Sequence, residues 1–210
     1  SEMCIRDRGW EKCDTHVFWG EIAPCHHLLQ IYESDDVILD SLEGFVKSGF
    51  NAGESVIIIA TPLHLDALNK RLESHRINVA AFLASEQFIP LVAQDTLDLF
   101  MVNNWPDEEK FMKVVESLVL RARGNSNRPV RAYGEMVAIL WSKGHSGATV
   151  QLEHLWNKFC EKEIFCLFCA YPKSGFTQDV STSIAHICAS HNKIIAGDIK
   201  STTEVFYKTA

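Results

Sequence analysis

The stretch Arg128–Trp141, RPVRAYGEMVAILW, decides the fold because it contains two hydrophobic periods. Up to Gly134, small or apolar residues alternate with polar ones, which is the period-2 pattern of a β-strand. After Gly134 the apolar residues follow helical spacing until the next glycine. The stretch therefore predicts a strand, a turn and a helix, with Arg131, Tyr133 and Glu135 on one face where the strand ends.

That strand end has two interpretations. In open α/β sheets, ligands bind at the carboxyl ends of the strands, whereas a strand buried between two helical layers is almost wholly apolar. A cation, a phenol and a carboxylate side by side thus predict either a satisfied core network or a binding site. Spacing alone leaves both interpretations open.

Strands and helices alternate along the rest of the chain, which predicts an α/β fold with a mostly parallel central sheet and helices on both faces. The other expected strands are His27–Tyr32, Glu54–Ala60, Phe88–Val92, Ile164–Ala170 and Lys193–Ala196. The other expected helices include Val79–Ala84, Thr96–Val102, Thr149–Glu161 and Thr177–His191.

No repeat or linker divides the chain, so residues 16–199 are predicted to form a single domain. Residues 1–15 show no clear pattern and are expected to be an N-terminal arm, either disordered or not native to the protein. Residues 200–210 are expected to be a polar tail.

The composition is that of a globular protein, with 47% hydrophobic and 22% charged residues. A net charge of −7 argues against a nucleic-acid partner. No apolar run approaches the roughly 20 residues that span a bilayer, and the N-terminus does not resemble a secretory signal. Seven cysteines, mostly in apolar stretches, indicate reduced thiols and a cytoplasmic location.

The turn after the first expected strand argues against nucleotide binding. Nucleotide-binding α/β domains have a glycine-rich turn followed by a lysine at this place. Here the segment Tyr32–Asp36 has neither glycine nor lysine, and it contains three carboxylates. Asp35 and Asp36 fit the first turn of a helix, where acidic residues favour the macrodipole. Tyr32 and Glu33 lie at the strand's carboxyl end and are candidates for ligand contact.

No metal site and no cofactor are predicted. Glu21, Cys25, His26 and His27 match no standard zinc spacing, and neighbouring residues of a strand point to opposite faces. The pair Cys166–Cys169 has an odd separation on a strand, which also sends the two thiols to opposite faces. No Ser/His/Asp or Cys/His arrangement suggests a catalytic site, so the protein is expected not to be an enzyme.

Six motifs, in this order and spacing, resemble those of the MEDS domains, the DcmR-type sensory domains of methanogens and methylotrophs. The resemblance spans residues 16–195. Its motifs are FWGEIAPCHHLLQIYESDD, GESVIIIATPLHL, FMVNNWPDEEKF, VRAYGEMVAILW, TVQLEHLWNKF and FCLFCAYPKSGFTQD. The resemblance implies a KaiC/RecA-like three-layer core with a degenerate phosphate loop, which senses small molecules, proposed to be hydrocarbon derivatives. It also implies association with histidine kinases or transcription regulators.

Each motif of the family matches particular residues of this chain. The His–Tyr strand matches His27 and Tyr32, and the R-x-Y/F-G-E motif matches Arg131, Tyr133, Gly134 and Glu135. The L-E-x-L-W motif matches Leu152, Glu153, Leu155 and Trp156, and the C-A-Y-P motif matches Cys169–Pro172. The expected ligand-binding residues are His27, Tyr32, Glu33, Arg131, Tyr133, Glu135, Glu153, Trp156 and Tyr171. In one departure, Val92 stands where the family usually has an aspartate, which predicts a different ligand or weaker binding.

The predicted function is a non-catalytic small-molecule sensory module. The chain shows no kinase, receiver or DNA-binding segment beside the sensory core, so its output is expected to pass through a partner or a homo-oligomer. Two alternatives stay open at this point. One is a repurposed RecA-like nucleotide-binding protein, and the other is an interaction scaffold with a filled pocket.

Overall fold

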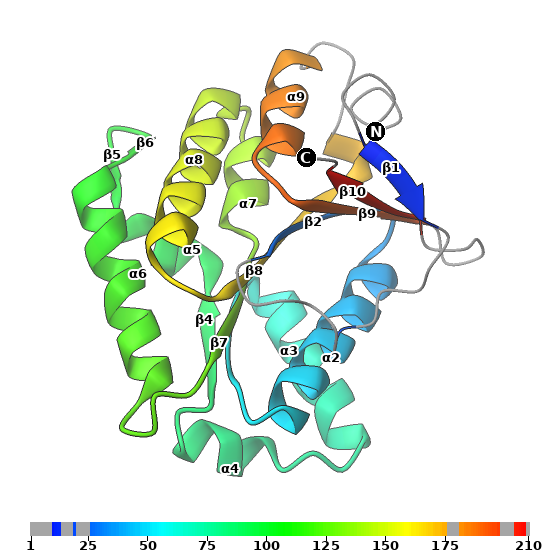
Figure 1. Ribbon diagram of the computed structural model, residues 1–210, viewed down its shortest axis with the longest axis vertical. Coiled ribbons are helices and arrows are strands. Elements are labelled where there is room, and N and C mark those ends of the chain that lie inside the picture. Colours follow the sequence, from blue (N-terminus) through cyan, green and yellow to red (C-terminus); the bar gives the residue numbers. More distant parts are fainter. Residues whose placement is uncertain (1–9, 14–18, 20–25, 176–180, 198–203, 209–210) are drawn as a thin grey trace.

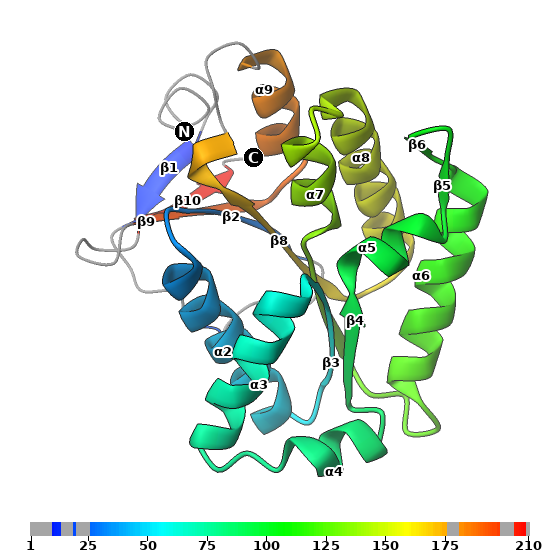
Figure 2. The ribbon, with the colours of Figure 1, turned by 180° about the vertical axis from the view of Figure 1, so that it is seen from behind.

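A mostly parallel β-sheet forms the centre of the protein (Figures 1 and 2). The computed structural model describes residues 10–13, 19, 26–175, 181–197 and 204–208. Its strands are β1 (Trp10–Cys13), β2 (His27–Tyr32), β3 (Ser55–Ala60), β4 (Phe88–Val92), β5 (Met101–Val102), β6 (Trp105–Pro106), β7 (Val130–Gly134), β8 (Cys166–Pro172), β9 (Lys193–Gly197) and β10 (Glu204–Lys208). The sheet order is β1-β10-β9-β2-β8-β7-β3-β4. The six strands from β9 to β4 are parallel, as the sequence predicts.

Helices cover both faces of the sheet, as expected (Figures 1 and 2). They are α2 (Asp35–Asn51), α3 (Pro62–Ser74), α4 (Val79–Ala84), α5 (Ala93–Asp98), α6 (Glu108–Arg123), α7 (Met136–Ser142), α8 (Ser146–Lys162) and α9 (Ser181–Ala189), with a 3₁₀ turn at Lys173–Gly175. Apolar residues of α2, α3 and α4 pack on one face, and those of α5 to α9 pack on the other. Within the described residues, no helix combines the length and apolarity needed to cross a membrane.

The stretch around Gly134 folds as predicted, into β7, a one-residue junction at Glu135 and α7. The α7 helix ends beside Gly144, whose φ of +76° suits glycine. A similar junction follows β3, where the side chain of Thr61 accepts the backbone N–H of His64 and Pro62 occupies the first helical turn. Both strand-to-helix junctions lie at the carboxyl edge of the sheet.

Alternation along β8 determines which side chains share a face. Cys166 and Phe168 pack with the α2 and α3 side, whereas Cys169 and Tyr171 pack with the α7 and α8 side. The prediction that Cys166 and Cys169 point to opposite faces is therefore confirmed. None of the four cysteines whose side chains are described forms a disulfide.

Three segments differ from the sequence-based expectation. The presumed arm and the presumed tail contain β1 and β10, which pair antiparallel with each other, and β10 pairs antiparallel with β9. The helix expected at Thr96–Val102 instead spans Ala93–Asp98, and Met101–Val102 forms β5. Asn103 and Asn104, with positive φ angles of 50° and 61°, form the hairpin turn between β5 and β6.

Arg131 forms a structural ion pair near the amino end of β7, and not a contact at the carboxyl edge. It shares the face of Tyr133, as predicted, but it lies beside Val56 near the start of β3. Its side chain is 3% exposed. The guanidinium donates to Glu54 and to the carbonyl of Phe45, the latter over 3.0 Å. The expectation that Arg131 lies where the strand ends is therefore wrong, because the structure places it near the amino end of β7, away from Glu135.

We expect Arg131→Met to lower the free energy of unfolding by roughly 3 kcal/mol, because it breaks a largely buried ion pair and leaves a buried carbonyl without its donor. Urea denaturation measures the loss. The matched control is Arg121→Met, which removes an exposed pair with Glu86 and should change stability by no more than about 1 kcal/mol. Equal losses for the two variants would contradict the structural role of Arg131.

Candidate functional site

One cluster of polar side chains surrounds Glu135 at the carboxyl edge of the sheet. Glu135 is 3% exposed and forms the junction between β7 and α7. Its Oε1 accepts the Tyr133 hydroxyl over 2.8 Å and contacts Nδ1 of His64 at 2.5 Å. Its Oε2 accepts the backbone N–H of Thr61 over 2.8 Å. These groups, the carboxyl-edge cluster, link β7, α7 and α3 through a single carboxylate.

His64 connects the buried carboxylate to the surface. Its Nε2 lies 3.5 Å from Oδ1 of Asp35, whose side chain is 63% exposed. The hydrogen bond with Glu135 raises the pKa of His64, with the charges of Glu135 and Asp35 adding to the rise and burial opposing it. The sequence interpretation missed His64. The sequence did contain one indication of its role. His64 falls in the first turn of the helix that follows Thr61, at the same sheet edge as Glu135.

Tyr32 and Glu33, the two site residues predicted at the carboxyl end of β2, have different surroundings. Tyr32 packs on the same face as Tyr133, and burial raises its pKa, with the charges of Glu135 and Asp35 adding to the effect. Glu33 instead forms an ion pair with Lys173 near the surface. Between Tyr32 and the α2 helix, the buried hydroxyl oxygen of Ser34 has no hydrogen-bond partner among the described residues.

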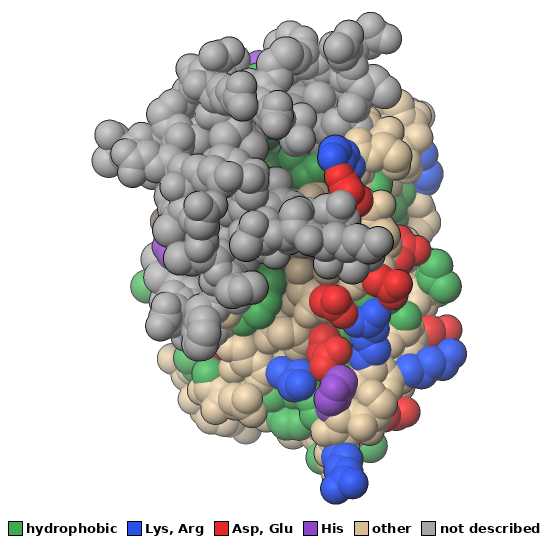
Figure 3. Space-filling view, turned by 90° about the vertical axis from the view of Figure 1, so that its right-hand side faces the viewer, with side chains coloured by type: hydrophobic (Ala, Val, Ile, Leu, Met, Phe, Trp, Pro, Cys, Tyr) green, Lys and Arg blue, Asp and Glu red, His purple; other side chains and the backbone are tan. Residues whose placement is uncertain are grey.

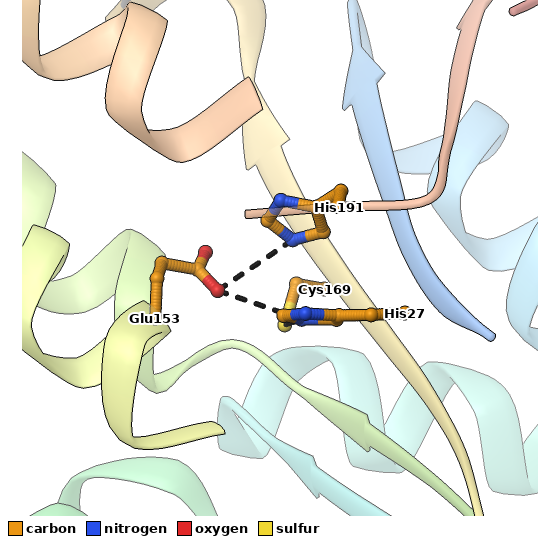
Figure 4. Close-up of side chains that lie close together, drawn as sticks. All are labelled: His27, Glu153, Cys169 and His191. Atoms are coloured by element: carbon orange, nitrogen blue, oxygen red, sulfur yellow. Dashed lines mark hydrogen bonds and ion pairs between the residues drawn. The ribbon is translucent and has the colours of Figure 1, made fainter. Parts of the chain in front are cut away.

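The remaining polar candidates lie on the opposite face of the sheet. Glu153 of α8 is fully buried, and its Oε1 accepts the Tyr171 hydroxyl over 2.5 Å. Its Oε2 lies 3.5 Å from Nε2 of both His27 and His191. Sγ of Cys169 lies 3.4 Å from Nε2 of His27. Figure 4 shows His27, Glu153, Cys169 and His191 pointing toward one another, and we call these four the Glu153 cluster.

Burial disfavours charge throughout the Glu153 cluster. It raises the pKa of Glu153 to about 8, against the opposing effect of the Tyr171 hydroxyl and of the nearby Cys169 thiol. It lowers the pKa of His27 to about 4, although bonds with Asn157 and Ser190 oppose the shift. The contacts between the carboxylate and the two rings are therefore not ordinary ion pairs between a charged acid and a charged base.

The residues that were predicted to form one site therefore form two clusters, one on each face of the sheet. Tyr32, Tyr133 and Glu135 come together on one face, and His27, Glu153 and Tyr171 come together on the other. Trp156 belongs to the aromatic core, with Phe111 4.9 Å from it between ring centroids. Cys169 and His191 were missed, because alternation alone gives the face of Cys169 but not its neighbours.

Two surface cavities lie near these elements. One of about 280 Å³ is lined by His27, His191, Asn157 and neighbouring residues, so it adjoins the Glu153 cluster. The other, about 510 Å³, lies at the amino ends of β7 and β8, and Arg131 and Cys166 are among its lining residues.

The sequence matches the family model of the MEDS domain, "MEthanogen/methylotroph, DcmR Sensory domain", over residues 26–192. The chain belongs to the MEDS family. The match supports a sensory or signalling role and covers both polar clusters. No curated protein matches the chain in sequence.

Solved structures confirm the fold of this MEDS domain. A KaiC-like protein from the hyperthermophilic archaeon Pyrococcus horikoshii OT3 is similar with a TM-score of 0.55 and 7% identity, over 87% of this chain and 77% of that one. Another Pyrococcus horikoshii OT3 protein, known from a structural study, gives a TM-score of 0.57 and 11% identity, over 88% and 87% of the two chains. At such identities the likeness shows the α/β fold alone.

The raised pKa of His64 predicts how stability depends on pH. A histidine whose pKa is higher in the folded state stabilises the protein fully below its unfolded value of about 6.5, and this contribution is lost as pH rises through the folded value. Stability measured by urea unfolding should therefore fall over that range. In His64→Gln this part of the pH dependence should be missing, and an unchanged pH profile would contradict the His64–Glu135 pairing.

Proposed function

We propose that this MEDS domain is a non-catalytic sensory module that binds a small organic molecule at the carboxyl-edge cluster. The observation that carries the proposal is the chain of contacts from buried Glu135 through His64 to exposed Asp35. It lies where open α/β sheets bind their ligands. A ligand that contacts this chain at the surface would change interactions that fix both the β3–α3 and the β7–α7 junctions.

The chemistry of the edge favours a neutral or cationic ligand. Glu33 in the turn after β2 and Asp35 at the start of α2 are acidic, and the basic groups beside them, Lys173 and His64, are already paired with carboxylates. An anionic group would therefore meet like charge. The Ser34 hydroxyl and the Tyr32 phenol offer polar contacts beside apolar side chains. A hydrocarbon derivative, with an apolar body and one polar group, fits this combination best.

We further propose that the bound state is transmitted to a signalling partner such as a histidine kinase or a transcription regulator. The surface near α2 is suited to a polar interaction, because Arg71 of α3 pairs there with Asp36 and Asp40 of α2. Figure 3 shows acidic and basic side chains interspersed on the described part of the face on which α2 lies. A surface with both signs of charge favours a protein partner over nucleic acid.

Substitutions at the cluster should separate binding from stability. Tyr133→Phe removes one hydrogen bond to Glu135 and should cost about 1 kcal/mol of stability, while it weakens ligand binding. Thermal shift with a panel of small alcohols, amines and halogenated alkanes measures the response. At least one compound should stabilise the unchanged protein and fail to stabilise Tyr133→Phe and Glu135→Gln.

The matched control is Glu86→Gln, since Glu86 forms an exposed pair with Arg121 and precedes β4, at the amino edge of the sheet. This variant should respond to the compound as the unchanged protein does. If Tyr133→Phe and Glu135→Gln also respond normally, the ligand does not bind at the carboxyl edge.

We also expect no tight binding and no hydrolysis of Mg-ATP. The two residues between β2 and α2 are Glu33 and Ser34, so a polyphosphate would meet a carboxylate and find no glycine-rich backbone nest. Isothermal titration should show no saturable heat at micromolar nucleotide. A micromolar dissociation constant that is lost on Ser34→Pro would overturn this expectation.

A further inference from the structure

We propose that the Glu153 cluster is a binding site for one divalent transition-metal ion, and that Zn²⁺ is the ion its side chains suit best. The cluster is independent of the carboxyl-edge site, since it lies on the other face of the sheet. Its four side chains come from β2, α8, β8 and the segment between α9 and β9 (Figure 4). Each is at most 1% exposed, and their four ligand atoms all lie within 4.8 Å of one another.

Both imidazole rings are oriented as metal ligands. Nδ1 of His191 lies 2.6 Å from the carbonyl oxygen of Ile187, and Nδ1 of His27 lies 3.1 Å from the carbonyl oxygen of Ser190. A carbonyl only accepts, so each Nδ1 carries the hydrogen and each Nε2 presents its lone pair to the cluster. Asn157 adds a second contact to Nδ1 of His27, at 2.8 Å. Outer contacts of this kind fix the tautomer of metal-binding histidines.

Two polar atoms at the centre of the cluster lack a hydrogen-bond partner in the described part of the chain. Tyr171 occupies Oε1 of Glu153, which leaves Oε2 facing the two Nε2 atoms. Glu153 Oε2 and His191 Nε2 are buried without a hydrogen-bond partner among the described residues. A buried polar atom without a partner lowers the stability of the folded state. A cation at the centre would satisfy both atoms at once.

The spacing of the ligand atoms fits tetrahedral coordination. With zinc bonds of about 2.0–2.1 Å to nitrogen and oxygen and about 2.3 Å to sulfur, neighbouring ligand atoms should be roughly 3.4–3.6 Å apart. The observed distances are 3.5 Å for both nitrogen–oxygen pairs and 3.4 Å from His27 Nε2 to Cys169 Sγ. The other three pairs of ligand atoms lie within 4.8 Å of one another, so small shifts of these side chains would complete a tetrahedral site.

The ligand types select the class of ion. Two imidazoles, a thiolate and a carboxylate suit Zn²⁺ and its first-row neighbours, whereas Ca²⁺ and Mg²⁺ require mostly oxygen ligands. The thiolate and the carboxylate would balance both charges of the ion, so the filled site would be neutral in the core. A cavity of about 280 Å³ lies beside the two histidine rings, on the side of Asn157 and Ser190, so solvent approaches the cluster closely there.

The sequence predicted no metal site, because the proposed ligands are far apart along the chain. The four ligands lie between positions 27 and 191, on elements that become neighbours only when β2, β8 and β9 pair and α8 packs over them. The spacing of residues along the sequence could not reveal that these four side chains meet. Of the candidates considered there, His27 belongs to the cluster and His26 does not, whereas Glu21 and Cys25 lie outside the described residues.

The test is a Co²⁺ titration of the chelator-treated, folded protein, with circular dichroism as the check of folding. One equivalent of Co²⁺ should produce the visible bands of tetrahedral cobalt together with an ultraviolet thiolate-to-cobalt band, and Zn²⁺ should then displace the cobalt. The melting temperature should also rise with Zn²⁺, because binding to the folded state alone stabilises it by mass action.

Substitutions assign the site. Cys169→Ala should abolish the thiolate band, whereas Cys166→Ala, on the opposite face of the same strand, should retain it. Asn157→Leu removes only an outer contact to His27 and should weaken Zn²⁺ binding roughly 10- to 100-fold. This milder variant keeps the test decisive even if Cys169→Ala fails to fold.

Three results would overturn the proposal. The first is a folded wild-type protein that takes up neither Co²⁺ nor Zn²⁺ in stoichiometric amount. The second is a thiolate band that survives Cys169→Ala or disappears in Cys166→Ala. The third is a Zn²⁺ affinity that Asn157→Leu leaves unchanged.

Discussion

A carboxylate buried in a protein core must find donors or a cation, and this requirement shapes both faces of the central sheet. Glu135 meets it within the fold, because Tyr133, His64 and the backbone of Thr61 all contact its two oxygens. Glu153 meets it only in part, because Tyr171 serves one oxygen while the other faces imidazole nitrogens. The difference between a satisfied and an unsatisfied carboxylate separates the roles proposed for the two clusters.

Parallel strand pairing sets the positions from which these groups act. The β8 strand lies between β2 and β7, so the side chains of β2 and β7 are not direct neighbours across the sheet. Alternation along β8 then directs Phe168 to one helical layer and Cys169 and Tyr171 to the other. A change at either cluster therefore acts on a different set of helices, so one domain could bind the proposed metal on one face and respond to the proposed ligand on the other.

Much of the architecture could be predicted from sequence, because it depends on local periodicity. Strand alternation gives the shared face of Arg131 and Tyr133 and the opposed thiols of Cys166 and Cys169. The change to helical spacing after Gly134 gives the junction at Glu135. What could not be predicted depends on distant pairing. The strands β1 and β10 pair with each other from opposite ends of the chain, and Glu54 meets Arg131 only through the register of β3 and β7. His191 joins Glu153 for the same reason.

The central claim is that the unsatisfied acceptors around Glu153 hold a metal ion. The most direct measurement is X-ray diffraction from crystals grown with Zn²⁺, with data collected on both sides of the zinc absorption edge. A single anomalous peak should lie about 2.0–2.3 Å from Nε2 of His27 and His191, Oε2 of Glu153 and Sγ of Cys169. No peak there, with the carboxyl group of Glu153 hydrogen-bonded directly to an imidazole, would contradict the claim.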